Sequence, residues 1–241
     1  MAESAWAPSL TKAVPAVRNV PRHSLVIRVT HWLTVLWVGA LLLSGIEILI
    51  SHPRFYWGEA GNSSTQALFR LPIPASRATV PTGYGYVLPD QNGWSRSLHF
   101  EAAWGLVLTG CWYLISGLVT GHFRKNLLPA RWSWSEVSAT IASHVRLRKP
   151  VDAEYNVVQR LAYLGAVFVL FPAMIWTGLA MSPAVVSALP FVVTVLGGQQ
   201  SARTMHFFCT LGLVLFVLVH VGMVVLAGFR NRMGAMITGG K

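Results

Sequence analysis

Four of the eight histidines in this chain lie inside or at the start of long apolar stretches: His31, His99, His206 and His220. Ionisable groups at membrane depth are costly and usually functional, although a single neutral histidine can simply bond to a neighbouring helix. His206 and His220 are 14 residues apart, so on one helix they point to nearly the same side, about 21 Å apart along the axis. Because that separation is too long for one metal ion, it predicts two cofactors stacked along the helix.

Each histidine of this helix needs an opposite ligand at a matching depth. His99 begins the second apolar stretch and matches His206 on the outer side, whereas His31, near the inner start of the first stretch, matches His220. Neutral imidazoles on facing helices inside an apolar shell are the ligands that b-type haem requires. The sequence therefore predicts two bis-histidine haem sites in a four-helix bundle.

Two other histidines are alternative ligands. His52 could replace His99 outside and His122 could replace His31 inside, but each lies just beyond the end of its apolar stretch. The last two histidines are expected at the cytoplasmic surface: His23 and His144.

Haem also needs cations for its propionates and room for its porphyrin. The candidate cations, which interfacial snorkelling explains equally well, are Arg96 and Arg203 outside and Arg28 and Arg160 inside. The candidate small residues, which close helix packing also explains, are Gly39, Gly45, Gly105, Gly110 and Gly212. With two cysteines and no Cys-x-x-Cys-His motif, the chain shows no sign of a disulfide framework, a Cys-rich cluster or covalent c-type haem.

The composition places these histidines in a membrane protein. Apolar residues are 54% of the 241 and charged residues only 11%, whereas soluble domains carry about 25% charged residues. So little charge cannot cover a soluble surface, which nearly excludes an ordinary cytosolic enzyme. Four predicted membrane spans cover 29–50, 98–121, 155–182 and 204–229, the third kinked at Pro172, with a short outer segment over 183–199.

The basic residues predict the orientation. With a cytoplasmic N-terminus, 14 Lys and Arg fall in inner segments and 5 in outer ones, the positive-inside pattern expected in a bacterial inner membrane. Both termini are then cytoplasmic, in a single membrane domain over 1–241 with a tail at 1–22 that lacks a signal-peptide core and should be kept. The net charge of +11 follows from this orientation and suits anionic membrane lipid, and no nucleic-acid partner is expected.

Two segments outside the spans are distinctive. The outer loop, 51–97, is long and rich in Gly, Pro and aromatic residues, among them Phe55, Tyr56, Trp57, Tyr84, Tyr86 and Trp94. We expect a folded cap whose exposed aromatics dock a partner, with a cap that only covers the bundle as an equal alternative. On the inner side, Ser133 and Glu136 fit a capping box that starts a short interfacial helix.

At these residues the chain resembles the bacterial cytochrome b561 / nickel-hydrogenase cytochrome b superfamily, and within it most closely the thiosulfate-reductase-type cytochrome b subunits. The resemblance runs from about residue 20 to the C-terminus. The strings that carry it are Arg28-Val-Thr-His31-Trp32, Leu98-His99-Phe100, Gly121-His-Phe-Arg-Lys-Asn-Leu-Leu-Pro129, Tyr155-Asn-Val-Val-Gln-Arg-Leu-Ala-Tyr163, Thr177-Gly-Leu-Ala-Met-Ser-Pro183, Gly197-Gly-Gln-Gln-Ser-Ala-Arg-Thr-Met-His206 and Met236-Ile-Thr-Gly239.

The resemblance implies two non-covalent b haems, exchange with the quinone pool and a redox partner on the outer face. Its ligand pattern corresponds to the four histidines singled out above, and it places the quinone site on the cytoplasmic side near His31 and His220. The long outer loop favours the multi-subunit kind, such as the anchor of a periplasmic molybdopterin oxidoreductase.

The expected protein is therefore an all-α membrane protein, a four-transmembrane-helix bundle holding two b-type haems, with a long outer loop and short interfacial helices. Its expected function is electron transfer between quinone and a periplasmic oxidoreductase. One alternative is a stand-alone quinone oxidoreductase, such as a superoxide oxidase. A haem-free anchor or a transporter is disfavoured, because the chain lacks inverted repeats and charged midplane residues.

Overall fold

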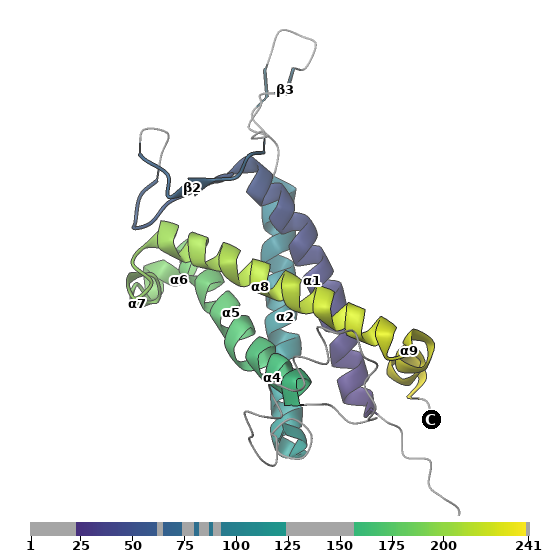
Figure 1. Ribbon diagram of the computed structural model, residues 1–241. Coiled ribbons are helices and arrows are strands. Elements are labelled where there is room, and N and C mark those ends of the chain that lie inside the picture. The colour runs from purple at the N-terminus through teal and green to yellow at the C-terminus, as the bar shows by residue number, and fades with distance from the viewer. Residues whose placement is uncertain are drawn as a thin grey trace, which may run out of the picture.

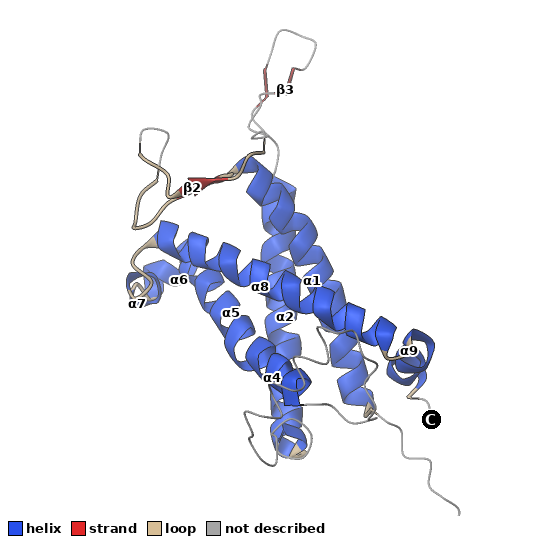
Figure 2. Cartoon of the chain, viewed as in Figure 1, coloured by secondary structure: helices blue, strands red, loops and turns tan. Residues whose placement is uncertain are grey.

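The computed structural model describes residues 23–61, 65–73, 80–81, 87–88, 93–123 and 157–239 (Figure 1). The regular structure of this part is mostly helical (Figure 2). Four of its helical segments are long and apolar enough to cross a membrane: Leu25–Ser51, Gly93–Val119, Leu161–Ala180 and Gln199–Leu226. The chain is thus an integral membrane protein, as its composition predicts.

The first two spans are helices α1 (Leu25–Ser51) and α2 (Gly93–Val119), which pack along each other. Midway along the pair, the Trp37 indole N–H donates a hydrogen bond to the Thr109 hydroxyl at 3.1 Å. The indole ring occupies the space that Gly105 leaves by having no side chain. This packing positions the two helices that carry His31 and His99.

The third span is interrupted halfway. It consists of α4 (Val157–Gly165), the π-helical segment η2 (Ala166–Leu170) and α5 (Phe171–Ala180). Pro172 has no N–H for the carbonyl four residues earlier, and its ring clashes with that carbonyl, so regular α-helical bonding cannot continue through it. The N–H of Phe171 bonds instead to the carbonyl of Ala166, five residues back, so the irregularity takes the form of a π turn.

Two short helices, α6 (Pro183–Ala188) and α7 (Phe191–Thr194), connect α5 to the last span, α8 (Gln199–Leu226). α5 packs against α8, and the small apolar core at this end is Ala180, Val192, Val193 and Ala202. After Gly228 the chain turns into α9 (Phe229–Thr238), which lies at the opposite end of the molecule from α6 and α7 (Figure 1).

The predicted outer loop, 51–97, contains two antiparallel strand pairs, β1 (Arg54–Phe55) with β2 (Phe69–Arg70) and β3 (Val80–Pro81) with β4 (Val87–Leu88). Two of the aromatic residues that were expected to be exposed, Phe55 and Tyr56, are buried, and that part of the expectation was wrong. Phe55 is 2% exposed, because it stacks on Phe69 and packs against Phe207 of α8, and the adjacent Tyr56 is also buried. Trp57, in contrast, is 58% exposed. The expected aromatics Tyr84 and Tyr86 lie outside the described residues.

The helix ends differ from the expected bounds by a few residues. α1 begins at Leu25, four residues before 29, while α2 begins at Gly93 and α8 at Gln199, each five residues before the expected starts. His31, His99 and His206 therefore lie further inside their helices than the sequence suggested. The tail at 1–22 and the inner segment 124–156, with Ser133, Glu136 and His144, lie outside the described residues.

Candidate haem sites

The four candidate ligands come together as two pairs. The ring centres of His99 on α2 and His206 on α8 are 6.2 Å apart, and those of His31 on α1 and His220 on α8 are 6.3 Å apart. Imidazole–metal bonds are about 2 Å long, so two imidazoles on opposite sides of one metal ion have ring centres about 6 Å apart. Both pairs therefore have the spacing that bis-histidine ligation of a haem iron requires.

The helices that carry these pairs leave room for a flat cofactor. α1 packs closely against α2, and α5 against α8, whereas α8 approaches the α1–α2 pair less closely. Each histidine pair takes one imidazole from α8 and one from the facing helix pair. Within the described part of the chain, no three His, Cys, Asp or Glu residues gather into a metal cluster. The arrangement suits haem between two helix pairs better than a metal ion held only by side chains.

Hydroxyl groups contact the Nδ1 atoms of both outer histidines. The Ser44 hydroxyl on α1 lies 3.0 Å from His99 Nδ1, and the Thr177 hydroxyl on α5 lies 2.9 Å from His206 Nδ1. Because Nδ1 is engaged in each ring, Nε2 is the nitrogen left to bind a metal.

The inner pair has a different environment. The Tyr163 hydroxyl lies 3.1 Å from His220 Nδ1, and the Phe216 ring stacks on the same imidazole with 6.0 Å between ring centres. His31 Nδ1 is buried and has no hydrogen-bond partner among the described residues. The indole of Trp32 meets the His31 ring edge-on at 5.3 Å.

Two glycines lie against the outer histidines. A Cβ added to Gly45 would lie 3.5 Å from Cε1 of His99, and one added to Gly178 would lie 3.5 Å from Cε1 of His206. Gly45 was predicted from the sequence as a small residue near haem, and Gly178 was not. Gly105, which was also predicted, faces an indole ring of α1 instead.

The loop after α1 covers the outer end of α8. The backbone N–H groups of Gln200 and Ser201, in the first turn of α8, donate to the carbonyl of Gly58 at 3.0 and 3.2 Å. The Ser201 hydroxyl in turn accepts from the Gly58 N–H at 2.7 Å. These bonds satisfy N–H groups that a helix start otherwise leaves unpaired, and they hold residues 52–59 over the outer histidine pair.

The predicted propionate partners are placed differently from one another. Arg203 donates to the carbonyls of Arg54, at 3.2 Å, and of His52, so it holds the same loop. Arg96 is exposed on α2. The side chain of Arg160 lies outside the described part of the structure.

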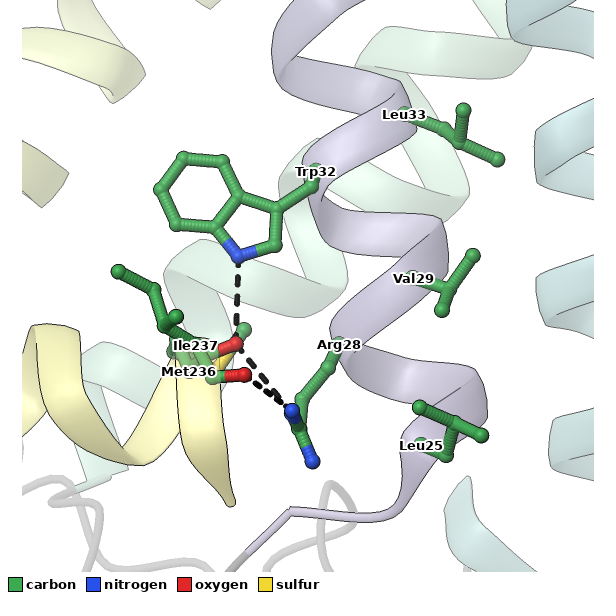
Figure 3. A pocket seen from close by; sticks show the side chains of 7 residues that line it. All are labelled: Leu25, Arg28, Val29, Trp32, Leu33, Met236 and Ile237. Carbon is green, nitrogen blue, oxygen red and sulfur yellow. Dashed lines mark hydrogen bonds between the residues drawn. The ribbon is translucent and has the colours of Figure 1, made fainter. Parts of the chain in front are cut away.

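A cavity of about 320 Å³ lies between α1 and α9, at the end of the molecule that was predicted to be the inner one (Figure 3). There the Trp32 indole N–H donates to the carbonyl of Met236 at 3.2 Å, while Arg28 donates to the same carbonyl at 3.4 Å and to that of Ile237. These bonds satisfy the last carbonyls of α9 and place a positive charge at its C-terminus. His31 does not line this cavity, but its ring contacts that of Trp32, which does.

The alternative ligands lie outside the two histidine pairs. His122 follows the end of α2 and packs beside the rings of Tyr113 and Phe123, and burial lowers its pKa. His52 ends α1, where its backbone N–H bonds to the carbonyls of Ile48 and Leu49.

Four membrane-crossing helices around paired histidines are the arrangement of a membrane cytochrome b. Comparison with known families agrees: residues 22–239 match the prokaryotic cytochrome b561 family, and the chain belongs to it. The family predicted from the sequence is thereby confirmed. Membership implies b-type haem and a role in electron transport.

One similar curated protein comes from Azospira oryzae. It is named "Putative protein-methionine-sulfoxide reductase subunit YedZ1" and is 30% identical over 217 residues, which are 90% of this chain and 96% of that protein. The similarity thus extends over most of the chain and is not confined to a single motif.

Proposed function

We propose that this chain is a di-haem cytochrome b that carries electrons across the bacterial inner membrane, between the quinone pool and a periplasmic oxidoreductase. The observation that carries the proposal is that two histidine pairs each take one imidazole from the same membrane-crossing helix, α8. His206 and His220 are separated by about 21 Å of helix rise, so each half of the membrane receives one redox site. Haem supplies reversible one-electron chemistry at such a site when bound.

The protein's own contribution is to hold and tune the two sites. His99 with His206 is proposed to bind the outer haem, and His31 with His220 the inner one. Apolar side chains of the spans keep water away and lower the local dielectric constant. Together with the axial ligands and their hydrogen bonds, this environment sets the reduction potential of each iron.

Three arginines precede three of the ligands by three residues each: Arg28 before His31, Arg96 before His99 and Arg203 before His206. Residues three apart share a helix face, so each guanidinium projects from the ligand's own face, one turn nearer the membrane surface. We propose that these arginines neutralise haem propionates. A guanidinium has five N–H donors, so the observed carbonyl contacts of Arg28 and Arg203 are compatible with that role.

The inner cavity is proposed to admit the quinone ring. Its volume of about 320 Å³ lies within the range of about 300–1,000 Å³ that is usual for small-molecule sites. It combines apolar walls, which include the Trp32 ring, with the guanidinium of Arg28. Arg28 has five N–H donors, so it can bond to a quinone carbonyl in addition to the carbonyls of Met236 and Ile237. The positive-inside bias of the basic residues supports a cytoplasmic location for this end.

The outer face is proposed to dock a redox partner, such as a molybdopterin oxidoreductase. Residues 52–59 are held on α8, the helix that carries one ligand of each pair, and Trp57 among them has 58% of its surface exposed. The Azospira oryzae relative is named as a reductase subunit, which favours a subunit over a stand-alone enzyme.

Reduction of the haem-loaded protein by a short-chain quinol in vesicles tests the quinone assignment. We expect the quinol to reduce both haems, and Trp32→Ala to slow that reduction while dithionite still reduces both. Trp104→Ala is the matched control, because Trp104 on α2 is 58% exposed and does not line the cavity. Equal rates for Trp32→Ala and wild type would exclude the cavity as the quinone site, and a quinol that reduces neither haem would contradict the proposed function.

A photo-crosslinking residue placed at Trp57 tests the outer partner. The expected result is capture of a periplasmic oxidoreductase subunit. Crosslinks that form only from the predicted cytoplasmic segment near Arg124 would contradict the proposal, because the docking face would then lie on the opposite side of the membrane. If the protein instead turns over quinol with a small oxidant after the outer loop has been removed, the stand-alone alternative holds.

A further inference from the structure

The two outer histidines are held in the same way by two different helices. In each case a hydroxyl residue followed by glycine faces the imidazole: Ser44-Gly45 on α1 faces His99, and Thr177-Gly178 on α5 faces His206. The hydroxyl lies 3.0 or 2.9 Å from Nδ1, and the glycine lets the neighbouring helix approach the ring edge. The same arrangement of a hydroxyl residue followed by glycine thus occurs at both ligands of one candidate haem site.

The hydrogen-bond directions follow from counting protons. A serine or threonine hydroxyl has one proton to donate. The Ser44 hydroxyl lies 2.7 Å from the carbonyl of Ala40, and the Thr177 hydroxyl 2.8 Å from that of Ala173, each four residues earlier in its helix. A carbonyl can only accept, so each hydroxyl donates to its own helix and accepts from the histidine.

This direction fixes the tautomer of both rings. Nδ1 carries the proton that the hydroxyl accepts, and Nε2 keeps the lone pair that an iron requires. Ser44 is 0% and Thr177 3% exposed, so water does not compete for either hydroxyl. Both outer ligands are therefore preorganised before haem binds.

The inner pair has no such symmetry. The phenol oxygen of Tyr163 lies 3.1 Å from His220 Nδ1. The glycine nearest to Tyr163 in the sequence, Gly165, does not contact a histidine, because a Cβ added to it would have no neighbour within 4 Å. Nδ1 of His31 is buried without a hydrogen-bond partner in the part of the chain that the structure describes. The two sites thus differ in how firmly their ligands are oriented.

We propose that Ser44 and Thr177 are positioning residues that orient the outer haem ligands and lower the reduction potential of the outer haem selectively. A hydrogen bond from Nδ1–H to a hydroxyl oxygen increases the basicity of Nε2, which stabilises the more positive ferric iron. The inference rests on the proposed di-haem function. It goes beyond that function because it assigns residues that set the difference between the two haems.

Redox titration of the purified haem-loaded protein, followed by visible absorbance and by the low-spin ferric spectrum, tests the inference. Thr177→Val removes the hydroxyl at nearly constant volume, and Ser44→Ala removes the other one. Each should raise the potential of one haem, change that haem's ferric signal and leave the second haem unchanged. Thr177→Ser, which keeps the hydroxyl, should restore wild-type behaviour.

Ser51→Ala is the control for loss of a buried hydroxyl, because Ser51 on α1 is 1% exposed and also bonds to the carbonyl four residues back, at 3.1 Å. It should change neither potential. Loss of the outer haem alone in Thr177→Val, restored in Thr177→Ser, would support the positioning role, because outer-sphere partners typically contribute about 10–100-fold to metal affinity. If Thr177→Val loses both haems, the inference is tested with Ser44→Ala, using the same redox titration and ferric spectrum.

Two results would overturn the inference. One is a retained outer haem whose potential and ferric signal are unchanged in both Thr177→Val and Ser44→Ala. The other is a shift of equal size in Thr177→Val and Thr177→Ser. Failure of the proposed function is seen separately, since it appears as fewer than two bis-histidine haems in the wild-type protein, and the inference then falls with it.

Discussion

Replacing Gly105 with alanine should weaken the packing of α1 on α2 without removing a candidate haem ligand. A Cβ at this position would lie 2.6, 2.8 and 2.9 Å from three atoms of the Trp37 indole. The indole cannot turn away at low cost, because it is rigid and its N–H donates to Thr109 at 3.1 Å. The Thr109 hydroxyl itself donates to the carbonyl of Gly105 at 2.7 Å. A shift of the indole would therefore also disturb the hydrogen bond between Thr109 and Gly105.

The expected cost has three contributions. Overpacking of a closely packed interface costs about 1–3 kcal/mol, and loss of the bond between Trp37 and Thr109 adds about 0.5–1.5 kcal/mol. Alanine regains about 0.5–1 kcal/mol, which glycine loses inside a helix. The free energy of unfolding should therefore fall by about 0.5–4 kcal/mol, which at about 2–4 °C per kcal/mol is a decrease of roughly 1–16 °C in Tm.

Thermal unfolding of the haem-loaded protein in detergent, followed by circular dichroism, measures this change. Gly110→Ala is the matched control on the same helix, because an added Cβ there has nothing within 4 Å and should leave Tm unchanged or slightly raised. An unchanged Tm for Gly105→Ala would refute the packing argument. An unchanged Tm with loss of haem would show instead that Gly105 borders the porphyrin, as the sequence alone suggested.

Three further changes have distinct expected outcomes. Gly198→Ala should lower stability by about 1–3 kcal/mol and speed proteolysis of the loop after α1, since φ is 112° there and the added Cβ would lie 2.5 Å from the backbone of Gly58. Arg203→Gln should accelerate hydrogen exchange in the same loop, because the guanidinium no longer holds its two carbonyls; unchanged exchange would show that the arginine does not secure the loop. His52→Ala and His122→Ala should each retain the full haem content of the wild type in a pyridine haemochrome assay, and a loss in either variant would reinstate that histidine as a ligand.

The membrane spans could be predicted from the sequence because each is a long run of apolar residues with few charges, and length alone then requires a helix across the bilayer. Their ends could not be predicted as well, because polar residues such as Ser95 and Ser201 continue α2 and α8 beyond the apolar core. Both serines are buried, Ser201 by the loop over α8. Contacts with a distant segment of the chain are not visible in local hydropathy.

The histidine pairs could be predicted because helical periodicity and depth are properties of sequence spacing. The residues around them, such as Ser44 and Thr177, could not be predicted. Serine and threonine are common in membrane helices, and only the tertiary structure shows which histidine each of them contacts. The expected exposure of Phe55 and Tyr56 in the outer loop is the clearest error. Phe55 and Trp57 look alike in the sequence, but the first is buried against Phe207 and the second is exposed, a difference that the tertiary packing of the loop decides.

Haem content and spectra of single histidine variants test the central claim most directly. The account predicts two b haems per wild-type chain by pyridine haemochrome assay. It further predicts that His99→Ala and His206→Ala lose the same haem, while His31→Ala and His220→Ala lose the other, because a single imidazole left in an apolar site binds haem weakly. One haem or none in the wild type, or different losses within a pair, would contradict it.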